Sequence, residues 1–306
     1  MIVIACPGQG SQTPGFLSEW LEDPAARDFL GQASETLGVD LVAHGTESDA
    51  ETIRDTAIAQ PLIVAASILA RRALEQRVSI DAAGVAGHSV GEFAAAAAAG
   101  VLSDADALSL VGVRGRAMAE AATAADTGMS AVVGGVEADV LSTIEAHGLT
   151  PANRNGGGQV VAAGAIDSLA ALAEDAPRGA RVIPLQVAGA FHTEYMASAV
   201  PALREAAEQV SVSDPVRPLW TNADGSRVSD GSRFLELLVS QIANPVRWDA
   251  CMEGFREAGI TGLIELTPAG ALTGIAKRAL KGVPAVAVKS PADLDAAVQL
   301  ITDSAA

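Results

Sequence analysis

The segment VAGHSVGEFAAAAAAG, residues 85–100, constrains the fold more than any other part of the sequence. A short apolar stretch leads into the pattern Gly87-x-Ser89-x-Gly91, and an alanine-rich stretch of high helix propensity follows and ends at Gly100. This order predicts a strand that turns sharply into a helix, with the serine at the turn. Small residues are common in a chain with 30 glycines, so an ordinary loop is the alternative interpretation.

Strand and helix patterns alternate on both sides of this segment. The apolar run at 2–5 predicts a buried strand that ends in a glycine-rich turn, and helical periodicity covers 58–76 and 104–124. Further strands are expected in RPLWTN at 217–222 and in GLIELTP at 262–268. This alternation predicts an α/β fold with a largely parallel sheet.

A different order of elements interrupts the α/β pattern in the middle of the chain. Strand, helix, strand, strand, helix and strand patterns follow one another there, which is the ferredoxin-like order. The α/β pattern then resumes. We therefore expect a large α/β-hydrolase-like core with a parallel sheet, made of residues 1–125 and 188–306, interrupted by a small ferredoxin-like subdomain at 126–187.

Composition and charge argue against several classes of protein. The 306 residues carry a net charge of −17, which argues against nucleic-acid binding. Charged residues interrupt every apolar run before the roughly 20 residues that a membrane-spanning helix needs, and the N-terminus lacks the basic region of a signal peptide. The two cysteines form no disulfide framework, and no His, Cys or carboxylate cluster has metal-ligand spacing. We expect a cytoplasmic protein with no metal and no membrane or nucleic-acid partner.

A serine nucleophile needs a base, and the sequence contains four histidines. His44 and His147 lie at apparent ends of helices or loops, where exposed or capping residues are common. His88 is adjacent to Ser89, and neighbours at a sharp turn point in different directions, so a bracing role is favoured. His192 follows the expected subdomain, where the chain returns to the core. It is the candidate base, and a buried structural histidine is the alternative.

Five motifs, taken together and in this order, resemble a known family. They are PGQGSQ at 7–12, GHSVGE at 87–92, RGRAM at 114–118, GAFH at 189–192 and QIANPVRW at 241–248. The family is that of the malonyl-CoA:acyl carrier protein transacylases, the acyltransferases of fatty acid and polyketide synthesis. The resemblance covers essentially the whole chain, and it is strongest to the free-standing bacterial enzymes of type II synthesis, particularly the actinobacterial ones.

The resemblance implies a Ser–His dyad. Ser89 matches the family's nucleophile, which carries the malonyl ester, and His192 matches its general base. Gln241 matches the residue whose backbone carbonyl orients that histidine, in place of the aspartate of a triad. An imidazole pKa of about 6.5 suits proton transfer in both directions. Asp224 is interpreted as a turn residue, because Asp-Gly is a common turn pair.

The resemblance also implies how the thioester is held. Gln9 and Val90 match the residues whose backbone N–H groups form the oxyanion hole. Arg114 matches the arginine that binds the malonyl carboxylate, whereas Arg116 is interpreted as a surface charge on another side of the helix. Asn155 belongs to a loop that lines or braces the family's site, although an ordinary hairpin turn explains it equally well.

One aromatic residue bears on the choice of acyl group. In the polyketide acyltransferases that the chain resembles, enzymes with a phenylalanine directly before the catalytic histidine use malonyl, and those with a serine there use methylmalonyl. Phe191 occupies this position, and Val90 stands where methyl-accepting enzymes often have glutamine. A preference for malonyl is therefore expected. The alternative is that Phe191 only packs in the core.

The sequence leaves the role of two further features undetermined. Thr267, in ELTPAG, stands where the family usually has a glycine, which leaves the geometry of the turn after Glu265 undetermined. Lys277, Arg278 and Lys281 form a basic face at helical spacing. An acidic carrier protein could dock there, but positive charge near a helix C-terminus is also ordinary.

The function implied by the resemblance is transfer of malonyl from malonyl-CoA to the phosphopantetheine thiol of acyl carrier protein. Transfer proceeds through a malonyl-serine ester in a ping-pong sequence and supplies extender units for fatty acid or polyketide synthesis. The coenzyme A thioester is a substrate, and no cofactor is implied. A serine hydrolase is one alternative, but it would not need an arginine for a substrate carboxylate. A catalytically silent binding module is the other, and the presence of Ser89 and His192 argues against it.

Overall fold

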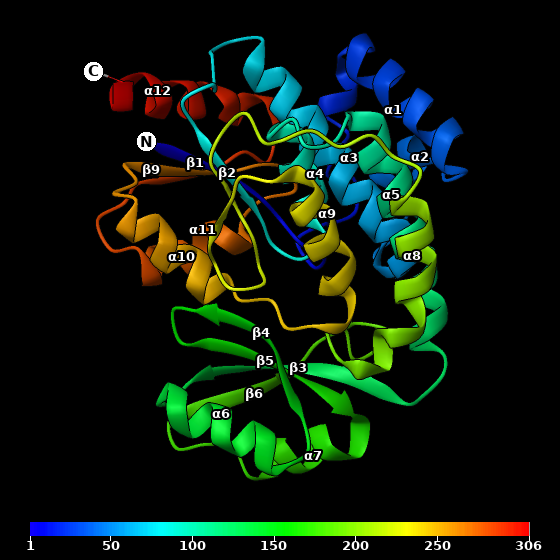
Figure 1. Cartoon of the computed structure of the whole chain (residues 1–306), viewed down its shortest axis with the longest axis vertical. Coiled ribbons are helices and arrows are strands. Elements are labelled where there is room, and N and C mark those ends of the chain that lie inside the picture. Colours follow the sequence, from blue (N-terminus) through cyan, green and yellow to red (C-terminus); the bar gives the residue numbers. More distant parts are fainter. Residues whose placement is uncertain (306) are drawn as a thin grey trace.

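The computed structural model describes residues 1–305, which form two β-sheets and the helices around them (Figure 1). The larger sheet has six strands in the order β10-β9-β1-β2-β7-β8. Neighbouring strands pair in parallel, except that β8 is antiparallel to β7. The expected α/β fold with a largely parallel sheet is therefore confirmed. The strands are β1 (Ile2–Cys6), β2 (Gly84–Gly87), β7 (Leu219–Trp220), β8 (Arg227–Val228), β9 (Gly262–Glu265) and β10 (Ala285–Ala287).

Helices cover both faces of this sheet, and the side chains of β1 alternate between them. Val3 and Ala5 pack with residues of α10 and α11. Ile2 and Ile4 belong to the apolar cluster that includes α3, α4 and α5. Because both faces are covered, the strand has to be apolar throughout. The α-helices of this part are α1 (Pro24–Leu37), α2 (Leu41–Thr46), α3 (Thr56–Glu75), α4 (Gly91–Ala98), α5 (Asp104–Ala122), α8 (Val200–Ala207), α9 (Gly231–Ser240), α10 (Trp248–Glu257), α11 (Ala271–Ala279) and α12 (Leu294–Ala305). The short 3-10 helices are η1 (Trp20–Glu22), η2 (Thr52–Arg54), η3 (Glu194–Ala199), η4 (Gln241–Ala243) and η5 (Pro291–Asp293).

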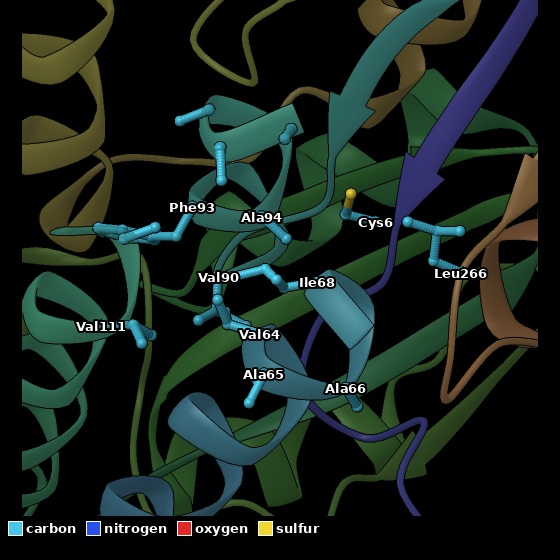
Figure 2. Packing of buried hydrophobic residues seen from close by; sticks show 14 of the residues in the cluster. Cys6, Val64, Ala65, Ala66, Ile68, Val90, Phe93, Ala94, Val111 and Leu266 are labelled. Carbon is cyan, nitrogen blue, oxygen red and sulfur yellow. The ribbon is translucent and has the colours of Figure 1, made fainter. Parts of the chain in front are cut away.

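Helix α4 is enclosed by other parts of the protein on every side. All eight of its residues are buried. Phe93 and Ala94 lie in the same apolar cluster as Val64 and Ile68 of α3 (Figure 2). The alanine side chains keep the helix thin, so it fits between α3, α5 and the ends of β1 and β2. Helix α3 is long and apolar enough to cross a membrane, but most of it is buried inside the protein, as in the core helix of a globular protein.

The second sheet has four antiparallel strands in the order β4-β5-β3-β6. Its elements follow along the chain as β3 (Thr127–Gly134), α6 (Glu137–Ala146), β4 (Thr150–Gly156), β5 (Gln159–Ala165), α7 (Ile166–Glu174) and β6 (Ala180–Pro184). Val132, Ile144 and Leu172 join this sheet to its two helices in a separate apolar cluster. Strand β6 ends at Pro184, and the chain beyond it contributes Leu185 to a cavity.

Strand β4 connects the small sheet to the larger part of the protein (Figure 1). The Arg154 N–H donates to the Val246 carbonyl at 2.9 Å, and the Val246 N–H donates to the Ala152 carbonyl at 2.8 Å. Met129 and Ala131, on the side of the small sheet away from α6 and α7, line a cavity together with residues of the larger part. The small sheet therefore forms one wall of that cavity.

The turn after β9 contains Thr267, whose effect on the turn could not be determined from the sequence. The Thr267 hydroxyl donates to the Val288 carbonyl at 2.6 Å, and the Thr267 carbonyl accepts from Ser67 at 2.9 Å. The buried Glu265 carboxylate accepts backbone N–H groups of Gly270, Leu272 and Thr273 at the start of α11. Thr267 thus bonds this turn to two neighbouring segments of the chain.

The glycines around Ser89 are required by close backbone contacts. A Cβ atom at position 87 would lie 2.1 Å from the carbonyl carbon of Gly91, and one at position 91 would lie 2.2 Å from the Cys6 carbonyl oxygen. No real Cβ atom tolerates such distances. The chain can therefore pass from β2 into α4 only because Gly87 and Gly91 have no side chain.

We predict that Gly87→Ala lowers the free energy of unfolding by about 3 kcal/mol or more, or prevents folding, because the added methyl overlaps with backbone. Gly31→Ala is the matched control: it lies inside α1, and an added Cβ there meets no atom within 4 Å. That change should stabilise the protein by about 0.5–1 kcal/mol. Urea unfolding measures both variants, and equal midpoints would contradict the prediction.

Candidate active site

Ser89 lies between β2 and α4 in the left-handed backbone conformation, with φ 51°. Few residues other than glycine adopt this conformation, so the surrounding contacts must hold it. The Ser89 N–H donates to Oδ1 of Asn222 at 2.7 Å, and the His88 N–H donates to the Cys6 carbonyl at 2.9 Å. These bonds hold the serine in the wall of the cavity.

His192 is bonded on both sides of its ring. Its Nε2 lies 2.7 Å from Oγ of Ser89, and its Nδ1 lies 2.8 Å from the carbonyl oxygen of Gln241. A carbonyl oxygen can only accept a hydrogen bond, so Nδ1 carries the ring proton and Nε2 presents its lone pair to the serine hydroxyl. The histidine is therefore in the tautomer that can remove the Ser89 proton.

The expectation of an ordinary pKa for this histidine is wrong. Burial, together with the positive charge of Arg114, lowers the pKa of His192 from 6.5 to about 3. Burial disfavours the charged imidazolium because it removes water, and the nearby guanidinium repels the same charge. The ring is consequently neutral at neutral pH, as a base must be before it accepts a proton.

Arg114 projects from α5 into the interior, and its side chain has no solvent exposure. Its Nη1 donates to Oε1 of Gln60 at 2.6 Å, and its Nη2 donates to Oε1 of Gln241 at 2.9 Å and to Oγ of Ser89 at 3.3 Å. Within residues 1–305, its buried Nε has no acceptor. Burial lowers the pKa of Arg114 to about 9, and Glu92 opposes this shift, so the guanidinium stays charged at neutral pH.

Three buried polar residues complete the site and were not anticipated from the sequence: Gln60, Glu92 and Asn222. Besides holding the Ser89 N–H, Asn222 donates from Nδ2 to the Gly87 carbonyl at 2.7 Å. Glu92 accepts the Asn222 backbone N–H at 2.7 Å and a hydrogen bond from Nε2 of Gln241. Burial raises the pKa of Glu92, whereas these N–H donors and the positive charge of Arg114 favour its ionised form. A signal was available for two of them, since Gln60 and Glu92 are isolated polar residues in apolar helices.

Gln9 and Val90 both line the cavity, and each has a backbone N–H group. Neither donates a hydrogen bond to another group in the part of the chain that the structure describes. Gly8 allows the loop before Gln9 to approach the serine turn, because a Cβ there would lie 2.9 Å from the His88 ring. Two free donors beside Ser89 are the arrangement that an oxyanion hole requires.

The cavity has a volume of about 510 Å³, within the roughly 300–1,000 Å³ typical of small-molecule sites. Asn155 from β4 lies in its wall and accepts from Nε2 of His88 at 2.7 Å, while its own Nδ2 donates to Gln159 at 3.1 Å. Asn155 is thus both a lining and a bracing residue. The Phe191 ring also lines the cavity, next to His192.

The other residues considered from the sequence lie outside this arrangement. His44 bonds to Ser48 at 2.9 Å, and His147 bonds to Asp175 at 3.1 Å. Arg116 is exposed. Asp224 accepts the Ser226 N–H at 2.9 Å within its turn. Among residues 1–305 there is no group of three or more His, Cys, Asp or Glu side chains that could hold a metal ion.

Comparison with known proteins decides the family. Residues 3–297 match the family model described as the acyl transferase domain. The chain belongs to this acyltransferase family. A malonyl CoA-acyl carrier protein transacylase of Mycobacterium tuberculosis is 52% identical over 297 residues, which are 96% of this chain and 98% of the relative.

Solved structures of the acyltransferase family share the whole fold. The crystal structure of MCAT from Mycobacterium tuberculosis matches with a TM-score of 0.94 and 51% identity, over 97% of this chain and 99% of that one. A malonyl transacylase in complex with a type II PKS acyl-carrier protein matches with a TM-score of 0.90 and 30% identity, over 97% and 99% of the two chains.

We predict that the His192 ring of this acyltransferase is still neutral at about pH 5, below the ordinary histidine midpoint. A lowered pKa in the folded state means that the proton binds only at more acidic pH, and that stability contributed by the neutral ring is lost as the pH falls below about 6.5 toward 3. NMR titration of the ring C–H signals, assigned by comparison with His192→Gln, measures this. A midpoint near 6.5 would contradict the prediction.

Proposed function

We propose that this protein transfers malonyl from malonyl-CoA to the phosphopantetheine thiol of an acyl carrier protein, through an ester on Ser89. The observation that carries the proposal is the position of one hydroxyl. Oγ of Ser89 is 2.7 Å from a neutral His192 and 3.3 Å from the buried guanidinium of Arg114. A nucleophile and its base are thus combined with a charge that suits a carboxylate on the acyl group.

In the first half-reaction, Nε2 of His192 takes the Ser89 proton as Oγ forms a bond to the thioester carbonyl carbon. The N–H groups of Gln9 and Val90 stabilise the negative charge on the carbonyl oxygen. Collapse of the tetrahedral intermediate breaks the carbon–sulfur bond, and His192 returns the proton to the sulfur of coenzyme A. The kinetic mechanism is ping-pong, because coenzyme A leaves before the carrier protein binds. It uses a Ser–His dyad in which the Gln241 carbonyl orients the base.

The malonyl carboxylate binds Arg114 in this proposal. The unused Nε donor and the short distance to Ser89 support that role, because a malonyl ester places its carboxylate only a few atoms from Oγ. A charged hydrogen bond of this kind contributes roughly 1.5–3 kcal/mol. Burial lowers the pKa of His192, and the positive charge of Arg114 lowers it further. The carboxylate offsets this charge, so binding of malonyl makes the histidine a stronger base.

In the second half-reaction, the carrier thiol gives its proton to His192 and attacks the ester carbonyl. The carbon–sulfur bond of the new thioester forms, the bond between the acyl carbon and Oγ of Ser89 breaks, and His192 returns the proton to Oγ. Helix α11 supports docking of the carrier near the cavity, because Ala271, Leu272 and Ile275 line the cavity and Lys277 is exposed farther along. Arg278 contributes less charge to docking, since its guanidinium donates to the Gly157 and Gly274 carbonyls. A relative of this family has been solved with such a carrier protein.

We also propose that the chain is divided as the sequence indicates. Residues 126–187 form a small ferredoxin-like subdomain, and residues 1–125 and 188–306, of which 306 lies outside the described residues, form an α/β-hydrolase-like core. The strand order β4-β5-β3-β6 and the turn at Ser89 support these assignments. In this arrangement the acyl group lies between the two parts, next to Phe191. The Phe191 side chain takes up the space that a methyl branch on the acyl α-carbon would need. Malonyl is therefore preferred over methylmalonyl by about 1–3 kcal/mol.

The experiment that tests the function is intact-protein mass measurement after incubation with malonyl-CoA. The wild type should gain one malonyl group, and Ser89→Ala should gain none, because only the attacking oxygen is missing. His192→Ala should acylate at a rate reduced by roughly 10²–10⁴. Rapid release of free malonate without an adduct would favour the hydrolase alternative, and an undiminished adduct on Ser89→Ala would exclude the proposed nucleophile.

We predict that Arg114→Ala loses the preference for malonyl-CoA over acetyl-CoA. Removing the guanidinium costs the malonyl substrate a charged hydrogen bond, roughly a tenfold to hundredfold loss, whereas acetyl makes no such bond. The ratio of kcat/KM values for the two thioesters in the acylation step measures the effect. If the ratio is the same in mutant and wild type, Arg114 does not recognise the malonyl carboxylate.

A further inference from the structure

One acidic side chain is buried in the apolar helix α4, directly behind the serine turn. Glu92 is 1% exposed, and both of its carboxylate oxygens accept N–H groups. Oε1 accepts the backbone N–H of Asn222 at 2.7 Å, and Oε2 accepts Nε2 of Gln241. Glu92 does not line the cavity, so it can act on the reacting groups only through these two partners.

The Gln241 side chain is the partner that leads to the site. Its amide has a donor end and an acceptor end, and the two ends meet different groups. Nε2 donates to Glu92 and to the Ser89 carbonyl at 3.2 Å, whereas Oε1 accepts from Nη2 of Arg114 at 2.9 Å. Rotating the amide by half a turn would bring its NH₂ group against the guanidinium, and both groups are donors.

We propose that Glu92 is a positioning residue for Arg114: its carboxylate, which accepts at both oxygens, fixes the Gln241 amide with the oxygen toward the guanidinium. This inference rests on the proposed function, in which Arg114 binds the acyl carboxylate. The Gln241 side chain is buried, so water cannot substitute for a lost partner. Gln241 can therefore turn its oxygen toward Arg114 only while Glu92 accepts the N–H at the other end of the amide.

The Ser–His pair is connected to the same residue by a different atom. His192 bonds to the backbone carbonyl of Gln241, which does not move when the side-chain amide rotates. A change at Glu92 that reverses the amide should therefore impair recognition of the carboxylate more than proton transfer. This separation gives the proposal a readout that general loss of structure would not produce.

The test is Glu92→Gln, assayed in the acylation half-reaction with malonyl-CoA and with acetyl-CoA. The new amide can still accept the Asn222 N–H, but it then turns its NH₂ group toward Gln241 and forces that amide to reverse. The ratio of malonyl to acetyl kcat/KM should fall roughly tenfold or more, as expected for loss of a hydrogen bond to a charged group. An equal fall for both thioesters would overturn the proposal, because it indicates a general structural role.

A double-mutant cycle with Arg114→Ala separates this inference from the proposed function. If Glu92 acts through Arg114, Glu92→Gln should change the ratio in the wild-type background and leave it unchanged in the Arg114→Ala background. A further fall in the ratio in the Arg114→Ala background would overturn the inference. If Arg114→Ala itself leaves the ratio unchanged, Arg114 does not bind the malonyl carboxylate, and both that part of the proposed function and this inference are wrong.

Two other variants keep the test informative. Glu265→Gln replaces another fully buried glutamate, whose partners are the N–H groups at the start of α11, and should leave the ratio within about twofold of wild type. Glu92→Asp keeps an acceptor at both oxygens. If Glu92→Gln does not fold, Glu92→Asp should retain the malonyl preference even where its overall rate is lower, and loss of the preference in Glu92→Asp would overturn the proposal.

Discussion

A guanidinium buried without solvent is the interaction on which the rest of the site depends. Removing an arginine from water costs several kcal/mol unless its N–H groups find acceptors. Arg114 finds them in Gln60, Gln241 and Ser89, and the Glu92 side chain lies one residue farther away, beyond Gln241. These contacts bring together α3, α4, α5 and η4, so the groups that stabilise the charge are also the groups that surround the nucleophile.

The same charge connects substrate recognition with basicity. Burial disfavours a positive charge on His192 and lowers its pKa, and the charge of Arg114 acts in the same direction. A carboxylate that binds to the guanidinium removes part of that opposition. In the proposed function, malonyl therefore prepares the base that its own transfer requires, whereas acetyl leaves an uncompensated charge beside the dyad. Preference for malonyl then arises in binding and in proton transfer together.

Local features of the site could be predicted from the sequence, whereas features that depend on tertiary contacts could not. The turn at Ser89 was predictable because the glycine spacing reports a backbone constraint within a few residues. The small sheet was predictable in element order because its apolar periodicity is regular. Asn222 lies at the end of the expected strand at 217–222, and only the fold brings it to Ser89 across 133 positions. The pKa of His192 likewise depends on burial, which no motif encodes.

The central claim is that Ser89 passes its acyl group to a carrier thiol and not to water. The most direct measurement starts from malonyl-enzyme that has been separated from coenzyme A. One portion is incubated in buffer and another with phosphopantetheine-loaded carrier protein, and the intact masses of both proteins are followed. The account predicts that the enzyme keeps its malonyl group in buffer and loses it to the carrier, which gains the same mass. Loss of malonyl at the same rate in both samples, with no gain on the carrier, would contradict it.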